Sequence, residues 1–309
     1  MAIPDPKIPR AVSRAFAPAN GSLIFETYEA TASHGRGSLG VGFTLEAGVV
    51  ARVRRLDGIP PGDPEAAKPE TPDPEAVAAQ SSLLVDGVPW DFPTVRQVVA
   101  RLAPTPVRVE LHADLPFGCG FGMSGASALA TAYALGELFA LDREPRALAL
   151  VAHEAEVDQA TGRGDVGGQC NGGFMVRTRI GAPLDVEWLP IGETPVWCRI
   201  FGPISTRDVL RDAATMARVN AAGRAALDRL RDIPDVDLDR LLALSREFAE
   251  QSGLLTSARV RSAIADALAA GGQASMVMLG EAVVSSVPIP GARSYRVVRQ
   301  PARVLPEKD

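Results

Sequence analysis

The sequence predicts an α+β fold with two lobes, and two features of the chain support this prediction. The first half is rich in short segments whose apolar and polar residues alternate, as in half-buried strands. Residues 205–271 instead have the periodicity of helices, and strand-like segments return after them. Because strands dominate the first half and helices with strands form the second, we place the lobes at residues 1–180 and 181–309.

Three strands are expected in the first half, at residues 21–25, 43–53 and 107–113. Residues 35–42, which contain four glycines, are interpreted as a glycine-rich loop between the first two strands. Residues 56–76 are dense in proline and acidic residues and are expected to form a surface loop. Thr94 and Gln97 fit a capping box that opens a helix ending near Leu102.

A helix is expected at residues 147–157, before the second half begins. Further strands are expected at residues 173–180, 196–200, 274–279, 281–284 and 295–298. The helical stretch at residues 205–271 is interrupted at Ile233-Pro234 and at Gly253, residue types that end helices. This stretch is therefore expected to form separate helices.

Composition excludes several classes of protein. The chain is 46% hydrophobic and 22% charged, which is ordinary for a globular protein, and its net charge of −5 argues against a nucleic-acid partner. It has no apolar run of about 18 residues and no signal-like N-terminus, so no membrane association is expected. Its three cysteines have no metal-ligand spacing, which favours a reducing cytoplasmic location. With only three lysines, mechanisms that need a buried lysine have few candidates.

A glycine-rich turn at residues 115–125 (LPFGCGFGMSG) runs directly into an alanine-rich helical segment that extends to about Leu141. Glycines lack the Cβ atoms that would keep an anion away from the main chain, and they tolerate positive φ angles. The first turn of the helix has unpaired N–H groups and the positive end of the helix dipole. The segment is therefore interpreted as a cradle for a phosphate group.

Two alternatives to this interpretation remain open from the residues alone. Residues 120–125 also fit the G-x-G-x-x-G pattern of a dinucleotide-binding turn, which requires a following strand that ends in an acidic residue. Asp142 and Glu144 have a suitable distance along the chain, but they lie in a short turn between two expected helices. The other alternative is a strand-to-helix turn that binds no ligand.

A second constellation of polar residues lies at residues 153–169, where carboxylates on a helix precede an aspartate flanked by glycines. Glu154, Asp158 and Asp165 are candidates to hold a divalent metal ion or to accept a proton. Glycines around Asp165 would let a substrate come close. The alternative is an acidic, solvated helix face followed by an aspartate in a turn.

These two constellations resemble those of the GHMP kinases, a superfamily of small-molecule kinases. Residues 116–126 (PFGCGFGMSGA) are similar to their phosphate loop, P-x-x-x-G-L-G-S-S-A, with substitutions at three positions. The resemblance covers nearly the whole chain and is closest to the archaeal pantoate kinase branch, through residues 16–19, 37–42, 164–166, 204–207 and 275–280. It implies a two-lobed GHMP kinase fold, with a ribosomal protein S5 domain 2-like N-terminal lobe and an α+β C-terminal lobe.

The resemblance also implies the cofactors, ATP and Mg²⁺, and the residues that bind them. The ATP phosphates would be held by Gly118, Gly120, Gly122, Met123, Ser124, Gly125 and Ala126. Ser124 and Glu156, or in place of Glu156 its neighbour Glu154, would hold Mg²⁺, and Asp165 would act as the base. A third loop at residues 271–275 would close over the phosphates. The lysine of mevalonate kinase is absent at residues 17–21, so charge stabilisation must come from Mg²⁺, an arginine or main-chain donors.

Pantoate, the substrate that the resemblance implies, is a small hydroxy acid whose site needs a cation, a hydroxyl partner and an apolar wall. The candidate residues are Arg36, Ser38, Arg163, Thr206 and Arg207. The alternatives are a GHMP kinase for another small alcohol, such as homoserine or a mevalonate derivative, and a GHMP-fold protein that binds a ligand without catalysis. The family resemblance also suggests a homodimer.

Overall fold

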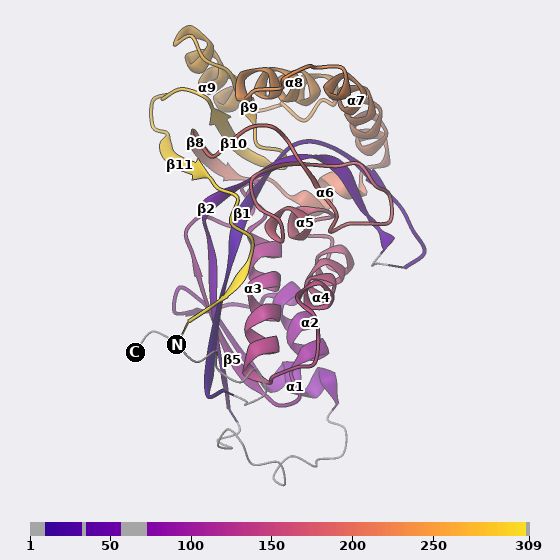
Figure 1. Ribbon diagram of the computed structural model, residues 1–309, viewed down its shortest axis with the longest axis vertical. Coiled ribbons are helices and arrows are strands. Elements are labelled where there is room, and N and C mark those ends of the chain that lie inside the picture. Colours follow the sequence, from indigo (N-terminus) through magenta and orange to yellow (C-terminus); the bar gives the residue numbers. More distant parts are fainter. Residues whose placement is uncertain (1–9, 33–34, 57–72, 307–309) are drawn as a thin grey trace.

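The computed structural model describes residues 10–32, 35–56 and 73–306 (Figure 1). Within α6, nothing is described of the side chains of Thr206, Arg207 and Leu210. No helix among the described residues is both long enough and apolar enough to cross a membrane.

Two long antiparallel strands, β1 (Val12–Tyr28) and β2 (Gly37–Arg55), form the centre of the first half. Strand β2 also pairs with β5 (Val107–Ala113), and the sheet continues through β3 (Ser82–Val85) to β4 (Val88–Pro89). The helices of this half gather on one face of the strands (Figure 1), namely α1 (Pro74–Gln80), α2 (Pro93–Leu102), α3 (Met123–Leu138) and α4 (Pro145–Asp158).

Helix α3 is the centre of the core. It is apolar on every side, and 14 of its 16 residues are buried, as expected for a helix enclosed by other elements. It packs against β1 and β2 on one side and against α2 and α4 on the other. Because α3 is enclosed in this way, its N-terminus has a fixed position beneath the glycine-rich turn.

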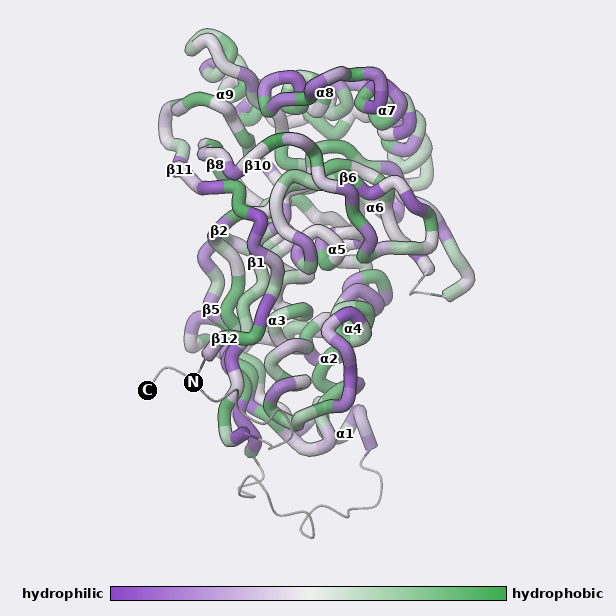
Figure 2. The backbone as a smooth tube through the Cα atoms, in the orientation of Figure 1, coloured by the Kyte–Doolittle hydropathy of each residue, from purple (hydrophilic) through white to green (hydrophobic). Residues whose placement is uncertain are grey.

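The second half contains its own strands and a layer of helices. Its strands are β8 (Thr194–Pro203), β9 (Ala274–Met276), β10 (Gly280–Ser285) and β11 (Arg293–Val297). Its helices are α6 (Thr206–Arg211), α7 (Ala213–Arg231), α8 (Leu238–Gln251) and α9 (Ala258–Ala269). Hydrophilic segments mark α7 and α8 in the hydropathy view (Figure 2), in keeping with their position at the edge of the molecule.

The two halves are joined by strand pairing. Val297 of β11 pairs with Leu45 of β2, so the strand order β4-β3-β5-β2-β11-β8-β10-β9 is continuous. The short elements α5 (Asp165–Gln169), β6 (Phe174–Arg177) and β7 (Glu187–Trp188) follow α4, and β6 pairs with β2. Strand β12 (Arg303–Leu305) returns to pair with β1. The lobe boundary at residue 180 stays a prediction.

Most of the expected elements are confirmed, but the glycine-rich loop at residues 35–42 is wrong. Strand β2 begins at Gly37 and runs through the glycines without a turn. A Cβ on Gly40 would lie 2.2 Å from the carbonyl oxygen of Ile24, and one on Gly48 would lie 2.1 Å from that of Ala17. These glycines therefore allow β1 to pack closely against β2, where the pairing has two register shifts.

Two smaller expectations also need correction. The helix that ends at Leu102 is confirmed, but its N-cap is Phe92 without a side-chain hydrogen bond, so Thr94 and Gln97 form no capping box. Gln97 instead donates to Asp158 at 2.6 Å. Of the expected loop at residues 56–76, residues 57–72 lie outside the described residues, and its last residues form the start of α1, capped by Asp73.

Candidate active site

A cavity of about 340 Å³ lies between the glycine-rich turn, the turn that precedes α5 and the strands β1 and β2. Segments from both halves of the chain line it, including residues 118–124, 160–165, 204–205 and 278–279. The sequence predicted that the glycine-rich turn and Asp165 share one site, and the structure places both in the wall of this cavity.

The glycine-rich turn needs its glycines for two separate reasons. Gly118, Gly120 and Gly122 have φ angles of 77°, 87° and 58°, a region that other residues rarely adopt. In addition, a Cβ on Gly122 would lie 2.9 Å from the side chain of Asp165, and one on Gly125 would lie 2.8 Å from the carboxylate of Glu156. The glycines therefore bring the main chain of the turn directly onto the two acidic side chains.

Gly122 is the N-cap of α3, so the turn ends at the positive end of a helix dipole. The first intrahelical hydrogen bond runs from the Ala126 N–H to the Gly122 carbonyl. The N–H groups of residues 123–125 precede that bond, and Met123 and Ser124 line the cavity. This geometry supports the predicted binding of an anion such as a phosphate.

The segment that packs against the turn differs from the one expected. Gly280 approaches so closely that a Cβ on it would lie 2.0 Å from the carbonyl carbon and oxygen of Cys119. Met278 and Leu279 line the cavity beside it. Residues 271–275 were expected in this place, but residues 271–273 connect α9 to β9 and residues 274–275 begin β9, and a Cβ on Gly272 would meet Val287 instead. The connection at residues 277–280 is thus the correct neighbour of the turn.

Asp165 is the first residue of α5, and its side chain is held by β1. The amide Nδ2 of Asn20 donates to its Oδ1 at 2.7 Å. Burial raises the pKa of Asp165, while the Asn20 hydrogen bond and the nearby Arg177 guanidinium oppose this shift. A buried carboxylate with one oxygen fixed is suited to accept a proton from a substrate hydroxyl.

Glu156 lies on the inner face of α4 and is completely buried. Among the described residues, neither of its carboxylate oxygens has a hydrogen-bond partner. Burial raises its pKa well above the usual range and the charge of Asp165 raises it further, while the Val166 backbone N–H and the Arg177 guanidinium oppose this shift. A Cβ on Gly162 would lie 2.5 Å from a Glu156 oxygen and 3.0 Å from an Asp165 oxygen, so the two carboxylates are near neighbours.

The two carboxylates match the donor chemistry that Mg²⁺ prefers. Mg²⁺ is bound by oxygen ligands and keeps several waters or substrate phosphates, so one or two protein carboxylates are enough. No group of three or more metal-ligating side chains occurs within the described residues, which is compatible with such a site. The orphaned oxygens of Glu156 are the observation that favours a cation here.

Glu154 and Asp158 lie on the other side of α4, where both pair with Arg101 at 2.6 and 2.9 Å. They lie outside the cavity wall. The interpretation of an acidic, solvated helix face therefore fits these two residues, whereas Asp165 lines the cavity and Glu156 lies buried behind it, next to Asp165 and Gly125. Of the two candidate glutamates, the structure places Glu156 beside Asp165.

Arg177 is a site residue that the sequence analysis missed. It ends β6, is almost fully buried, and donates from Nε to the Ser38 carbonyl and from Nη2 to Ser38 Oγ, both at 3.2 Å. Its charge lowers the pKa of both Asp165 and Glu156. It is thus an arginine that supplies positive charge near the base, one of the three sources expected in place of the missing lysine.

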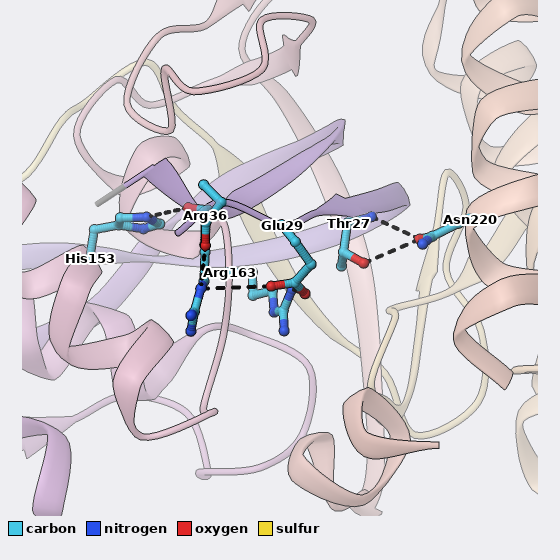
Figure 3. A network of polar contacts seen from close by, with 7 residues as sticks. Thr27, Glu29, Arg36, His153, Arg163 and Asn220 are labelled. Carbon is cyan, nitrogen blue, oxygen red and sulfur yellow. Dashed lines mark hydrogen bonds and ion pairs between the residues drawn. The ribbon is translucent and has the colours of Figure 1, made fainter. Parts of the chain in front are cut away.

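The predicted substrate residues are only partly brought together. Ser38 and Arg163 line the cavity. Arg163 pairs with Glu29, and Arg36 lies 3.7 Å from the same carboxylate while donating to the Ala30 carbonyl (Figure 3). The side chains of Thr206 and Arg207 lie outside the described part of the chain, although Ser205 before them lines the cavity.

Comparison with known proteins identifies the class. Residues 93–173 match the GHMP kinases N terminal domain, which covers the glycine-rich turn, Glu156 and Asp165. This part of the chain is therefore a GHMP kinase N-terminal domain. The alternative of a dinucleotide-binding turn is wrong, since α3 is followed by helix α4 and not by a strand.

The particular relatives are more specific. The chain is 32% identical over 207 residues to a pantoate kinase of Methanospirillum hungatei and 37% identical over 183 residues to one of Thermococcus kodakarensis. These matches cover 67% and 59% of this chain and span 64% and 59% of the relatives' lengths. Among solved structures, a phosphotransferase related to the CoA biosynthesis pathway has a TM-score of 0.77 at 25% identity, covering 95% of this chain and 98% of its own. A homoserine kinase from Cytophaga hutchinsonii has a TM-score of 0.66 at 18% identity, with coverages of 96% and 98%, and shares the fold.

Proposed function

We propose that this protein is an ATP-dependent kinase that phosphorylates the primary hydroxyl of pantoate and forms 4-phosphopantoate. The observation that carries this proposal is the pair of buried carboxylates, Asp165 and Glu156, directly beneath a glycine-rich turn at the N-terminus of a helix. The similarity to two pantoate kinases supports the choice of substrate.

Each part of the reaction has a residue suited to it. The main-chain N–H groups at Gly120–Gly125 bind the ATP phosphates, and Asn20 orients Asp165. Asp165 accepts the proton of the substrate hydroxyl as that oxygen forms a bond to the γ-phosphorus and the bond from this phosphorus to ADP breaks. Glu156 and the Ser124 hydroxyl would hold Mg²⁺, which when bound neutralises phosphate charge.

The cavity wall divides into parts that match the two reactants. Trp90, Phe92 and Phe117 form an aromatic group beside the glycine-rich turn, with ring centroids 5.6 Å apart for Trp90 and Phe117 and 5.5 Å apart for Phe92 and Phe117. We assign this group to the adenine base, which stacks on aromatic rings. Phe25 and Ile204 offer apolar surface for the gem-dimethyl group of pantoate.

The carboxylate of pantoate needs a cation, and one arginine of the cavity wall is well placed for it. Arg163 lines the cavity, and Arg177 lies behind Ser38, which is also in the wall. Arg36 and Arg207 remain candidates from the sequence. Arg163→Gln is expected to raise KM for pantoate more than KM for ATP, because only the acid carries the group that Arg163 binds.

The first test is direct. Purified protein is incubated with Mg-ATP and, separately, with pantoate, homoserine and mevalonate, and phosphorylated products are detected by mass spectrometry. Pantoate is expected to be the preferred acceptor. Turnover of mevalonate or homoserine without turnover of pantoate would refute the choice of substrate, and no turnover of any of them would favour a ligand-binding protein.

The second test examines the base. Asp165→Asn is expected to abolish turnover while ATP still binds, measured by calorimetry with a non-hydrolysable analogue. Asp158→Asn is the matched control, because Asp158 is a surface carboxylate of α4 that pairs with Arg101 outside the cavity. An unchanged rate in Asp165→Asn would remove this residue from the mechanism.

On the family resemblance we also propose a cytoplasmic homodimer, which analytical ultracentrifugation and cell fractionation would test.

A further inference from the structure

A side chain from helix α7 reaches strand β1 at the wall of the cavity. Oδ1 of Asn220 accepts a hydrogen bond from the Thr27 backbone N–H at 2.9 Å and another from Thr27 Oγ1 at 3.3 Å (Figure 3). Thr27 and Asn220 are 193 positions apart in the sequence, and Thr27 lines the cavity. The contact therefore links the helical layer of the second half to the candidate active site.

The chemistry of this contact fixes the direction of the Thr27 hydroxyl. A backbone N–H can only donate, so the Asn220 atom that it meets must be the amide oxygen and not the nitrogen. That oxygen has no proton to give, so the Thr27 hydroxyl must donate to it as well. The hydroxyl proton is then occupied, and Thr27 Oγ1 has only lone pairs left to offer. Toward a ligand, Thr27 is an acceptor.

Thr27 lies on the same side of the cavity as the base. Its Cα pairs with that of Ser38 across β1 and β2, which brings directly opposite side chains to about 4.5–5.5 Å at Cβ. Ser38 Oγ in turn would lie 2.3 Å from a Cβ on Gly164, the residue before Asp165. Contacts between neighbours therefore connect Thr27, Ser38 and Asp165 along the cavity wall.

We propose that Thr27, oriented by Asn220, selects substrates that carry a hydroxyl donor at the carbon next to the carboxylate, and so separates a 2-hydroxy acid from its 2-oxo counterpart. This inference rests on the proposed function and specifies which feature of the acid is recognised. A hydroxyl donates to Thr27 Oγ1, whereas an oxo group places a second acceptor against it. Sites built around a hydrogen bond reject ligands that lack the donor.

The experiment compares kcat/KM for pantoate and for its 2-oxo analogue, with Mg-ATP, in the wild type and in three variants. The wild type is expected to prefer pantoate. Thr27→Val should reduce kcat/KM for pantoate by roughly 5- to 100-fold, the range for a lost hydrogen bond to a buried partner, and change the oxo acid little. Thr27→Ser should keep most of the preference, because it keeps the hydroxyl.

Asn220→Leu distinguishes a role of Asn220 in substrate selection from a purely structural role. Without the amide oxygen, the Thr27 hydroxyl is free to donate, so kcat/KM for the oxo acid should rise while that for pantoate falls. Thr131→Val is the matched control for Thr27→Val, because Thr131 is buried in α3 outside the cavity wall and its hydroxyl has no partner among the described residues. It should leave both rates unchanged.

Three outcomes decide the matter. In the first, Thr27→Val and Asn220→Leu still phosphorylate pantoate and leave the ratio of the two kcat/KM values unchanged. This result overturns the inference and leaves the proposed function standing. Equal losses for both acids in both variants also overturn it, since they indicate a structural role. A wild-type protein that phosphorylates neither acid overturns the proposed function and this inference with it.

Discussion

Replacing Glu156 by glutamine should stabilise the ligand-free protein while it removes a ligand of the proposed Mg²⁺ site. The Glu156 carboxylate is completely buried, has no hydrogen-bond partner among the described residues and lies beside Asp165. An unsatisfied buried polar group costs about 1–3 kcal/mol, and a charged one costs more. Glutamine removes the repulsion between the two carboxylates, and its amide N–H groups can donate a hydrogen bond to Asp165. We therefore expect a gain of about 1–3 kcal/mol near neutral pH, or a melting temperature higher by roughly 2–8 °C.

The pH dependence of the stability difference between Glu156→Gln and wild type follows from the raised pKa of Glu156. Folding raises the pKa of Glu156, so the wild type has its full stability below the unfolded value of about 4.3, where the group is protonated, and loses it as the pH rises through the raised folded pKa. The difference between Glu156→Gln and wild type should thus be near zero at about pH 4 and grow toward neutral pH. Mg²⁺ with ATP should raise the melting temperature of the wild type more than that of the variant.

The assay is thermal unfolding followed by circular dichroism across this pH range, with and without Mg-ATP. Glu154→Gln is the matched control, because Glu154 is on the same helix but pairs with Arg101 at 2.6 Å on its outer face. That control should change stability by less than about 1 kcal/mol and keep its activity. A Glu156→Gln variant that melts below the wild type at neutral pH without ligands would show that the carboxylate is well paired and refute the reasoning.

Three further predictions follow from the structure. Gly280→Ala should cost about 1–3 kcal/mol in the free energy of unfolding and most of the activity, because its Cβ would lie 2.0 Å from the Cys119 carbonyl carbon; unchanged urea unfolding and kinetics would contradict the close packing. Trp90→Ala should raise KM for ATP about tenfold through the loss of base stacking, and a rise in KM for the acid instead would move the aromatic group to the other reactant. Thr131→Val should raise the free energy of unfolding by about 1 kcal/mol, since its buried hydroxyl has no partner in the described part of the chain; a lower urea midpoint would reveal a hydrogen bond there.

Local pattern was enough to predict the parts of the site that are close in sequence. The glycine-rich turn, the helix after it and the glycines around Asp165 can each be recognised within a short segment. The structure confirms that a strand, the turn and the helix follow one another in this order. The roles of Glu156 and Ser124 came from the family resemblance and remain predictions. The expectation of a loop at residues 35–42 is wrong because glycine within a strand can also mark the close approach of another backbone.

The residues that the sequence could not reveal are those whose role depends on a distant partner. Arg177 ends a short apolar strand, and nothing near it indicates that its guanidinium meets Ser38, 139 positions away. Asn20 lies within a long buried strand and reaches Asp165 across 145 positions. The connection at residues 277–280 meets the glycine-rich turn only because β9 and β10 pair there. Such contacts follow from topology, which periodicity does not encode.

The unsatisfied polar atoms of the interior extend the argument for a cation beside Glu156. Nine buried side-chain atoms of the described residues have no hydrogen-bond partner, and four of them belong to Asn20, Glu156 and Gln169. All four are oxygens of residues that surround the glycine-rich turn or Asp165: Gln169 donates its Nε2 to the Gly122 carbonyl at 2.8 Å, and Asn20 donates its Nδ2 to Asp165 at 2.7 Å. An interior optimised for stability alone would contain few unpaired acceptors, because each one costs free energy. A cation bound at the Glu156 carboxylate would satisfy both of its unpaired oxygens at once, so these acceptors favour a site whose stability is restored when a positive charge is bound.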